Sequence, residues 1–349
     1  MNRHASHHHR RGVLPALAAL LLLLPAALGL GGAEAQGRRT LEVVRARGVL
    51  SCGVLGTIYG FSAPDSGGVM RGIDADSCRA VAAAVLGDAN KVRFVMLAPQ
   101  SRFTAVQSGE VDVLFANTTW TLGRDAALGM TFTGVNYYDG QGFLVSRASG
   151  IAHAEQLDGA TVCLLAGGTA EQNLSDWFGA RKLRFTPVLM EQQNEMVQAF
   201  GAGRCDAITQ DASALSAHRR TLGPDRFVIL PELIGTEPLG GAVAKGDDQW
   251  FEIVRWTHNA AVMAEALGVT SNNAEAMRAS AVPAIRRLVG TEGDLGRQLG
   301  LGASWAFDLV KQVGNYGEMW ERNIGPTGVD RGRNRLWLEG GLQFSPPIR

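Results

Sequence analysis

Apolar segments of two lengths alternate between residues 40 and 120. Short apolar runs at 49–54, 91–97 and 111–116 have the length and composition of buried strands. The segments 76–86 and 101–108 lie between these runs and favour helices. This alternation of strands and helices indicates a layered α/β domain.

A second series of elements repeats the same order with a similar spacing. It consists of predicted strands at 161–165, 184–189 and 206–209 and predicted helices at 171–178 and 194–200. In both series a helix runs into a polar turn and then into a short apolar strand, at 108–112 and at 201–206. We therefore expect two similar α/β lobes.

Two extended segments, 137–145 and 237–244, connect the expected lobes. Because the chain crosses twice, it should enter the second lobe and then return to the first. Paired crossing strands of this kind form a hinge, with a cleft between the lobes. The predicted organisation is a leader at 1–35, a discontinuous first lobe at 36–139 and 242–349, and a second lobe at 140–241.

The start of the chain has the pattern of an export signal. Arg10 and Arg11 precede an apolar stretch at 12–33, and Ala-Glu-Ala at 33–35 fits a small-residue cleavage site. An uncleaved membrane anchor is the alternative, since about 20 apolar residues can span a bilayer. Two prolines and several glycines within the stretch weaken such a helix. We expect a signal peptide that is cleaved after residue 35 and a periplasmic mature protein.

The charge of the chain argues against a nucleic-acid partner. Its 349 residues include 33 basic and 33 acidic ones, and removal of the leader leaves 30 and 32, a net charge of −2. Four of the seven histidines lie in the leader and the other three are far apart, so no metal centre is expected. The mature chain also has none of the common nucleophile, zinc or dinucleotide motifs, and no cofactor is predicted.

The four cysteines are an even number in a chain that we expect to be exported, which favours disulfide bonds. Four cysteines allow three pairings, and four buried free thiols are the remaining alternative. Two of them fall in each predicted lobe, so Cys52 with Cys78 and Cys163 with Cys205 would each close one lobe.

Candidate binding residues follow predicted strands in both lobes, where ligands of open α/β sheets collect. After the strand at 111–116, the hydroxyls of Thr119 and Thr121 and the guanidinium of Arg124 could clamp a carboxylate. A solvated loop arginine with threonines as helix caps is the alternative.

The second lobe supplies two further candidates. Thr169 stands at a Gly-Gly-Thr helix start, where unpaired N–H groups attract anions, and Asp211 follows the strand at 206–209. Each could instead simply cap the following helix. Arg124 and Asp211 on opposite sides of a cleft would complement a zwitterion.

Many separate motifs resemble one family in order along the chain. The chain is similar to the periplasmic solute-binding proteins of polar amino-acid ABC transporters, and within them to the general L-amino-acid-binding branch. The matching stretches are 47–54, 60–65, 107–113, 117–121 with Arg124 and Asp125, 137–145, 203–207, 237–240, 313–318, 336–337 and 346–349.

The resemblance implies the two-lobed type II periplasmic binding protein fold, closing on an amino acid. In that comparison Arg124 holds the α-carboxylate, helped by Thr119 and Thr169, and Asp211 holds the α-ammonium group. The remaining implied ligand contacts are a nearby amide or backbone contact from Asn117, a pocket wall from Phe61 and recognition of an acidic side chain by Arg102. Arg102 could instead lie on a helix surface. The branch has Gly-Thr-Thr where this chain has Gly167-Gly168-Thr169, which removes one hydroxyl.

The function implied by the resemblance is capture of free L-amino acids, with broad specificity, and their delivery to the permease subunits of an ABC transporter in the inner membrane. We expect a monomer without enzymatic activity. Two alternatives remain: a periplasmic cyclohexadienyl dehydratase-like enzyme on the same scaffold, and an amino-acid sensor that docks on a chemoreceptor.

Overall fold

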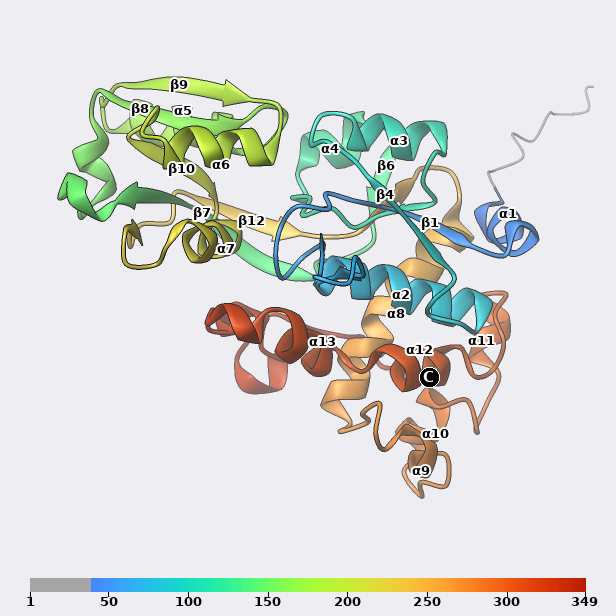
Figure 1. Cartoon of the computed structure of the whole chain (residues 1–349). Helices are drawn as coiled ribbons and strands as arrows, with labels where there is room; N and C mark the ends of the chain where they lie inside the picture. The colour runs from blue at the N-terminus through green and yellow to red at the C-terminus, as the bar shows by residue number, and fades with distance from the viewer. Residues whose placement is uncertain (1–38) are drawn as a thin grey trace, which may run out of the picture. The chain divides into compact units, whose positions relative to one another are not determined.

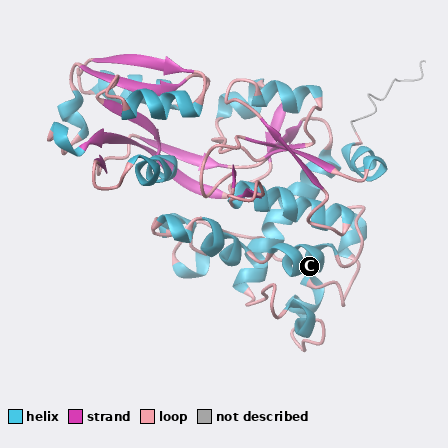
Figure 2. Ribbon diagram, in the orientation of Figure 1, coloured by secondary structure: helices cyan, strands magenta, loops and turns pink. Residues whose placement is uncertain are grey.

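The structure is a computed structural model that describes residues 39–349, so the expected signal peptide at 1–35 lies outside the described residues. Within the described range, no helix combines the length and the apolar character needed to cross a bilayer. Two main sheets and their covering helices make up this part of the chain, with one small extra hairpin (Figure 2). The hairpin consists of β2 (Ala63–Pro64) and β3 (Met70–Arg71).

The first sheet has five strands in the order β4-β1-β5-β13-β6. Its strands are β1 (Leu50–Val54), β4 (Val92–Met96), β5 (Val113–Leu114), β6 (Met130–Phe132) and β13 (Ala242–Ala244). β1 is buried along its whole length and pairs in parallel with β4 and β5. β13 comes from far along the chain and pairs antiparallel with β5 and β6. Residues beyond 240 therefore complete a sheet that begins near residue 50.

The second sheet has the order β11-β7-β10-β8-β9, and β12 pairs with the early part of β7. Its strands are β7 (Tyr137–Ser146), β8 (Ala160–Leu165), β9 (Phe185–Met190), β10 (Ala207–Asp211), β11 (Phe227–Ile229) and β12 (Gly235–Leu239). Neighbouring residues of the inner strands belong to different apolar clusters: Phe143 and Val145 pack in one cluster, and Leu144 between them packs in another. Because side chains alternate across a strand, both faces of this sheet are buried.

The register of β7 determines which polar residues meet. Its first half pairs with β12, with Asp139 opposite Glu237, and its second half pairs with β10, with Gln141 opposite Asp211 (Figure 1). The two segments that the sequence suggested as crossings therefore lie side by side. The predicted limits of the lobes themselves stay a prediction.

Helices cover both sheets. They are α1 (Thr40–Arg47), α2 (Ile73–Leu86), α3 (Arg102–Ser108), α4 (Leu122–Ala127), α5 (Ala170–Ala180), α6 (Gln193–Gly201), α7 (Ala212–Leu222) and α8 (Asp248–Ala266). Five short helices follow: α9 (Ala274–Met277), α10 (Pro283–Leu288), α11 (Leu295–Gln298), α12 (Trp305–Val313) and α13 (Tyr316–Asn323). Trp305, Leu309 and Trp320 from this region belong to the same buried apolar cluster as β1 and α2.

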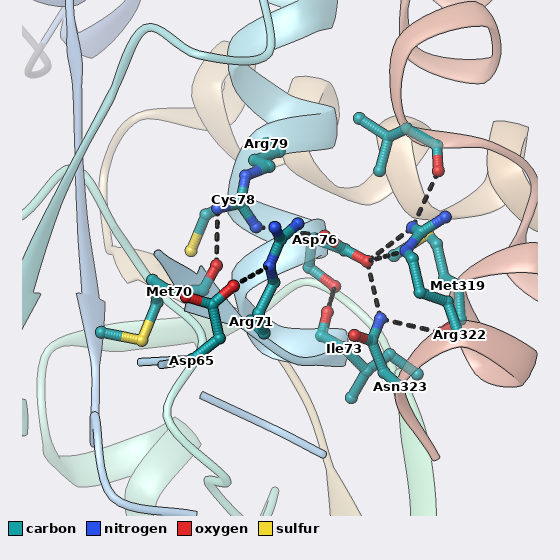
Figure 3. A network of polar contacts seen from close by, with 12 residues as sticks. Asp65, Met70, Arg71, Ile73, Asp76, Cys78, Arg79, Met319, Arg322 and Asn323 are labelled. Atoms are coloured by element: carbon teal, nitrogen blue, oxygen red, sulfur yellow. Dashed lines mark hydrogen bonds and ion pairs between the residues drawn. The ribbon is translucent and has the colours of Figure 1, made fainter. Parts of the chain in front are cut away.

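A buried carboxylate ties α2 to the last helix. Asp76 accepts hydrogen bonds from Arg322 and Asn323 of α13, both at 2.6 Å, and from Arg79 one turn along α2 at 3.2 Å (Figure 3). A buried charge is tolerated when it is paired and hydrogen-bonded in this way. The last helix of the chain is thereby fixed to α2.

The expected disulfide bonds are confirmed. Cys52 of β1 is bonded to Cys78 of α2, and Cys163 of β8 is bonded to Cys205 just before β10. The first bond joins a strand to a helix, the second joins a strand to the residues before its neighbour β10, and none of the four cysteines is free.

Candidate functional site

A polar cavity lies where the ends of strands from the two sheets approach each other. It is lined by Leu55, Pro99, Arg102, Asn117, Thr119, Leu165, Gly168, Thr169, Ala170, Thr209, Gln210 and Asp211. Five of the seven predicted ligand-binding residues are in this set: Arg102, Asn117, Thr119, Thr169 and Asp211. They come from segments more than a hundred positions apart. The cavity opens at the carboxyl ends of β5, β8 and β10, the edge at which α/β folds bind ligands.

The loop after β5 is held in an uncommon backbone conformation. Asn117 has a φ of +47°, a left-handed value that residues other than glycine adopt at a cost. Its backbone N–H donates to the buried carboxylate of Asp74 at 2.9 Å, which compensates for that cost. Thr119, two residues on, forms a bridge to Leu239 at the end of β12. These contacts fix the loop against both α2 and the crossing strands.

Two donors in the cavity wall have no hydrogen-bond partner. They are Nε of Arg102 and Nδ2 of Asn117, and no other buried side-chain nitrogen or oxygen of residues 39–349 lacks one. Arg102 is only 4% exposed, and its Nη1 donates to the backbone oxygen of Ala116 at 3.0 Å. Burial, and then the nearby Arg124, lower the pKa of Arg102 to about 9. A buried donor left unpaired costs free energy, so both atoms are suited to an incoming acceptor.

Arg124 lies beside the cavity wall and is not one of its lining residues. Thr121 caps α4 by accepting from the backbone N–H of Arg124 at 3.2 Å. The Arg124 guanidinium donates to the backbone oxygens of Thr119 and Gly167, at 2.9 and 3.5 Å. It also lies over the ring of Phe103, 5.1 Å from the centroid. Arg124 therefore contacts residues that follow strands of both sheets.

Asp211 ends β10, and its half-buried carboxylate has no hydrogen-bond partner among the described residues. It precedes α7, but its side chain makes no capping hydrogen bond to that helix, and no described residue donates to it. Burial, and then the charges of Asp139 and Glu237, raise the pKa of Asp211 well above its ordinary value. The helix-cap alternative for Asp211 has no support in these contacts. A cation entering the cavity would relieve the cost of ionising this group.

Glu237 is the main feature of the site that sequence reasoning missed. This residue of β12 is 1% exposed, and its Oε2 accepts from the hydroxyl of Thr119 and, at 2.8 Å, from that of Thr169. Its Oε1 accepts from Nδ2 of Asn173 at 2.6 Å. No described arginine, lysine or histidine forms an ion pair with it. The Glu-Pro-Leu-Gly motif was the available signal, but nothing in the motif assigned a role to its glutamate.

Two polar residues of β7, Asp139 and Gln141, lie beside the cavity without lining it. Asp139 accepts from the hydroxyl and backbone N–H of Ser213, and burial raises its pKa to about 6. The Gln141 amide donates to the hydroxyl of Thr209 at 2.9 Å and accepts from Asn173 at 2.9 Å. The crossing strands therefore place polar side chains next to the candidate site.

Phe61 does not lie in the cavity. It is 1% exposed, belongs to the apolar cluster of the first sheet and packs edge-to-face on Tyr137, with the ring centroids 5.0 Å apart. A motif match identifies a position, but it does not tell whether the side chain points to a core or to a ligand. Phe61 supports the base of β7 and does not line the pocket.

Residues 39–349 contain no group of three or more His, Cys, Asp or Glu side chains placed to hold a metal ion. The cavity and the residues beside it instead combine cationic donors, Arg102 and Arg124, with the acidic side chains of Asp211 and Glu237. Such a site can bind a small molecule that carries both charges.

Comparison with known proteins gives a consistent result. Residues 50–267 match the family described as bacterial extracellular solute-binding proteins, family 3. The chain is 48% identical to a general L-amino acid-binding periplasmic protein of Rhizobium johnstonii, over 94% of this chain and 99% of the relative. It is 49% identical to a glutamate/glutamine/aspartate/asparagine-binding protein of Rhodobacter capsulatus, over 93% of this chain and 96% of that relative.

Among solved structures, the fold is similar to that of an ABC transporter periplasmic binding protein from Brucella ovis with glutathione bound. The TM-score is 0.87 at 49% sequence identity, and the match covers 89% of this chain and 99% of that one. The expected two-lobed type II α/β fold is confirmed by this likeness together with the two sheets.

Proposed function

The chain belongs to family 3 of the bacterial extracellular solute-binding proteins, and on this premise we propose that it captures free L-amino acids in the periplasm for an ABC transporter. The relatives over nearly the whole chain length are named as amino-acid-binding proteins, which supports this class of ligand. The permease subunits of the transporter are the proposed partner, and a monomer delivers the ligand to them. The signal peptide at 1–35 is proposed to be cleaved on export.

The unsatisfied groups of the cavity carry the proposal. Asp211 has a carboxylate without a donor, and Arg102 and Asn117 have donors without an acceptor. An α-amino acid supplies the missing group to each, because its ammonium donates and its carboxylate accepts. We assign the ammonium to Asp211 and the α-carboxylate to Arg124, whose planar guanidinium can bind two oxygens at once.

The ligand side chain is assigned to Arg102 and Asn117. Both a carboxylate and a carboxamide offer an oxygen acceptor, so glutamate, glutamine, aspartate and asparagine fit the same pair of donors. The name of the Rhodobacter relative supports this group of ligands. Glutathione, which is bound in the Brucella structure, has a free α-ammonium and a free α-carboxylate group on its glutamyl residue. Glutathione is therefore included among the test ligands.

Calorimetric titration of the purified protein, stripped of ligand, tests the proposal. The panel consists of the proteinogenic L-amino acids and glutathione, and we expect acidic and amide amino acids to bind most tightly. Arg124→Ala should weaken L-glutamate binding by about 2–5 kcal/mol, roughly 30- to 5,000-fold, because a buried carboxylate loses its charged partner. Arg204→Ala is the control, since Arg204 is exposed and outside the cavity. If no amino acid bound, the proposal would be wrong.

Capture without turnover is tested in the same preparation. Asp139 and Asp211 have pKa values raised by burial, a property that general acids also need. We propose that Asp211 binds the ligand and that neither carboxyl transfers a proton to it. Sustained conversion of a cyclohexadienyl acid, followed by absorbance, would favour the dehydratase alternative.

A further inference from the structure

A side-chain amide takes the place of a neighbouring strand at the start of β7. Asn334 ends the short helix η4 (Gly332–Asn334) and is only 3% exposed. Its Oδ1 accepts from the backbone N–H of Tyr138 at 2.7 Å, and its Nδ2 donates to the backbone oxygen of the same residue at 3.0 Å. One amide therefore satisfies both backbone groups of Tyr138, as the opposite residue of an antiparallel ladder would.

The register of β7 explains why these two backbone groups lack a strand partner. Tyr138 is opposite Pro238 of β12, which has no backbone N–H to donate. The other edge of β7 pairs with β10 only at 141–145. Both backbone groups of Tyr138 thus lie beyond the end of β10, and Asn334 supplies the hydrogen bonds that buried backbone requires.

The pair formed by Tyr138 and Pro238 is held from both sides. Asn334 binds Tyr138, and the backbone N–H of Trp120, in the loop after β5, donates to the backbone oxygen of Pro238 at 2.8 Å. The Trp120 ring in turn stacks on Phe132 of β6, with the ring centroids 5.8 Å apart. This pair of residues is therefore attached to elements of the first sheet, although both strands belong to the second.

Asn334 is itself firmly anchored. The Nε of Arg331 donates to the backbone oxygen of Asn334 at 3.1 Å. The same guanidinium forms a two-pronged ion pair with Glu265 of α8, at 2.6 and 2.8 Å, and both side chains are only 15% exposed. Because α8 packs in the apolar cluster of the first sheet, η4 is fixed to that sheet as well.

We propose that Asn334 is a positioning residue of the hinge, which holds the start of β7 with the first sheet and confines bending to the positions after Tyr138. The inference rests on the proposed function, because a hinge acts only if the lobes close on a ligand. Asp139 and Gly140 are then the first positions of β7 at which the lobes can rotate. Asn334 lies outside residues 50–267, which match the family, so this clamp is an addition to the matched part of the chain.

Bending at this place acts directly on groups beside the cavity. Asp139 accepts from the hydroxyl and the backbone N–H of Ser213 at the start of α7, so it connects the bending point to the second lobe. Gly140 has no side chain, and a Cβ there would lie only 2.9 Å from the side chain of Leu233. A glycine at this point lets the backbone change its angles while the two strands stay close together.

Asn334→Ala should weaken the binding of different ligands by the same factor. Without the clamp, the start of β7 gains freedom in the open protein and has to be ordered again when the lobes close. Fixing the backbone of one residue corresponds to about 5- to 30-fold in affinity. We expect the Kd values of L-glutamate and L-glutamine, from calorimetric titration, to rise by factors that agree within about twofold, since Asn334 does not line the cavity. Unchanged Kd values, or a change confined to one ligand, would overturn the inference.

Asn323→Ala is the matched control for a general loss of stability. Asn323 of α13 is also a buried amide, 7% exposed, and donates to Asp76 and to the backbone oxygen of Met319 without contacting β7. We expect this variant to melt at a lower temperature and to keep both Kd values within about twofold. If it weakened binding as much as Asn334→Ala, the hinge role would be wrong. Should Asn334→Ala not fold, Asn334→Ser replaces it, because serine is too short to bridge both backbone groups.

Hydrogen exchange of the ligand-free protein measures the clamp without any ligand. The Tyr138 amide should exchange at least about tenfold faster in Asn334→Ala than in the wild type, and at the wild-type rate in Asn323→Ala. Equal exchange in all three proteins would overturn the inference and leave amino-acid capture intact. Absence of any amino-acid binding by the wild type would instead overturn the proposed function, and with it the role of the clamp in binding.

Discussion

Replacing Asp211 by asparagine should have opposite effects on ligand affinity and on the stability of the ligand-free protein. Affinity should fall because the ligand ammonium loses a charged partner. Asparagine keeps an oxygen acceptor at the same place, and Glu237 stays nearby, so the loss belongs at the lower end of the range for buried charge pairs. We expect about 2–3 kcal/mol, or roughly 30- to 150-fold in Kd for L-glutamate.

The effect on stability follows from the raised pKa of Asp211. A carboxyl whose pKa is higher in the folded protein than in the unfolded chain binds more protons when folded, so its ionisation costs stability above the ordinary aspartate pKa. At neutral pH the asparagine variant avoids this cost. It should therefore melt at a higher temperature than the wild type without ligand, and gain less on addition of L-glutamate.

Calorimetric titration and thermal unfolding at pH 7 measure the two effects on the same samples. Asp225→Asn is the control, because Asp225 is exposed and outside the cavity. Unchanged affinity in Asp211→Asn would refute its role at the ammonium. A lower melting temperature without ligand would refute the reasoning about the unsatisfied carboxylate.

Three further predictions concern other parts of the protein. Arg102→Gln should weaken binding of L-glutamate at least tenfold and that of L-alanine by less than threefold, measured by titration, because only the former has a side-chain acceptor. Replacing Cys163 and Cys205 by serine should lower the free energy of unfolding by about 4 kcal/mol, and replacing Cys52 and Cys78 by serine should lower it by about 3.5 kcal/mol, because the bonds close loops of 42 and 26 residues. Denaturant titrations measure both effects, and equal stability of the wild type under reducing and oxidising conditions would contradict them. Asp139→Asn should remove a penalty of at most about 3 kcal/mol at pH 7, since the pKa of Asp139 is raised from 3.8 to about 6; this penalty falls to roughly half at pH 5 and disappears only below the ordinary pKa. The free energy of unfolding has to be compared between variant and wild type at each pH. Burial lowers the pKa of His218 and His258 to about 4, so the whole protein also loses stability as the pH falls through this range. A difference between variant and wild type that does not change with pH would contradict the assignment.

The regular elements could be predicted from local pattern, because apolar runs and turns act over a few residues. β8 contains the whole predicted strand at 161–165 and one more residue at its start, and α5 contains the whole predicted helix at 171–178. The strand expected at 111–116 is shorter, since only Val113 and Leu114 pair in the ladder before the loop turns. The four-residue helices α9 and α11 lie outside the predictions, because such short helices depend on packing rather than on periodicity.

The site residues divide in the same way. Arg102, Thr119, Thr169 and Asp211 stand next to strand ends or turns that the sequence marks, and the structure brings them to one cavity. Glu237 is different, because its partners Thr119 and Thr169 are 118 and 68 positions away, and only the packing of β12 against the loops after β5 and β8 brings them together. No local pattern contains that packing.

The pairing of β7 with β12 also limits how a binding protein of this kind can be redesigned. Asp139 and Glu237 are opposite each other on strands of the second sheet, and Glu237 binds one threonine that follows each sheet, so this part of the candidate site depends on both sheets. A chimaera that joins the cavity loops of one parent to the connecting strands of another would inherit mismatched hydroxyl orientations. Grafting the preference for a new ligand therefore requires the strand pair to be exchanged together with the loops, as a single unit.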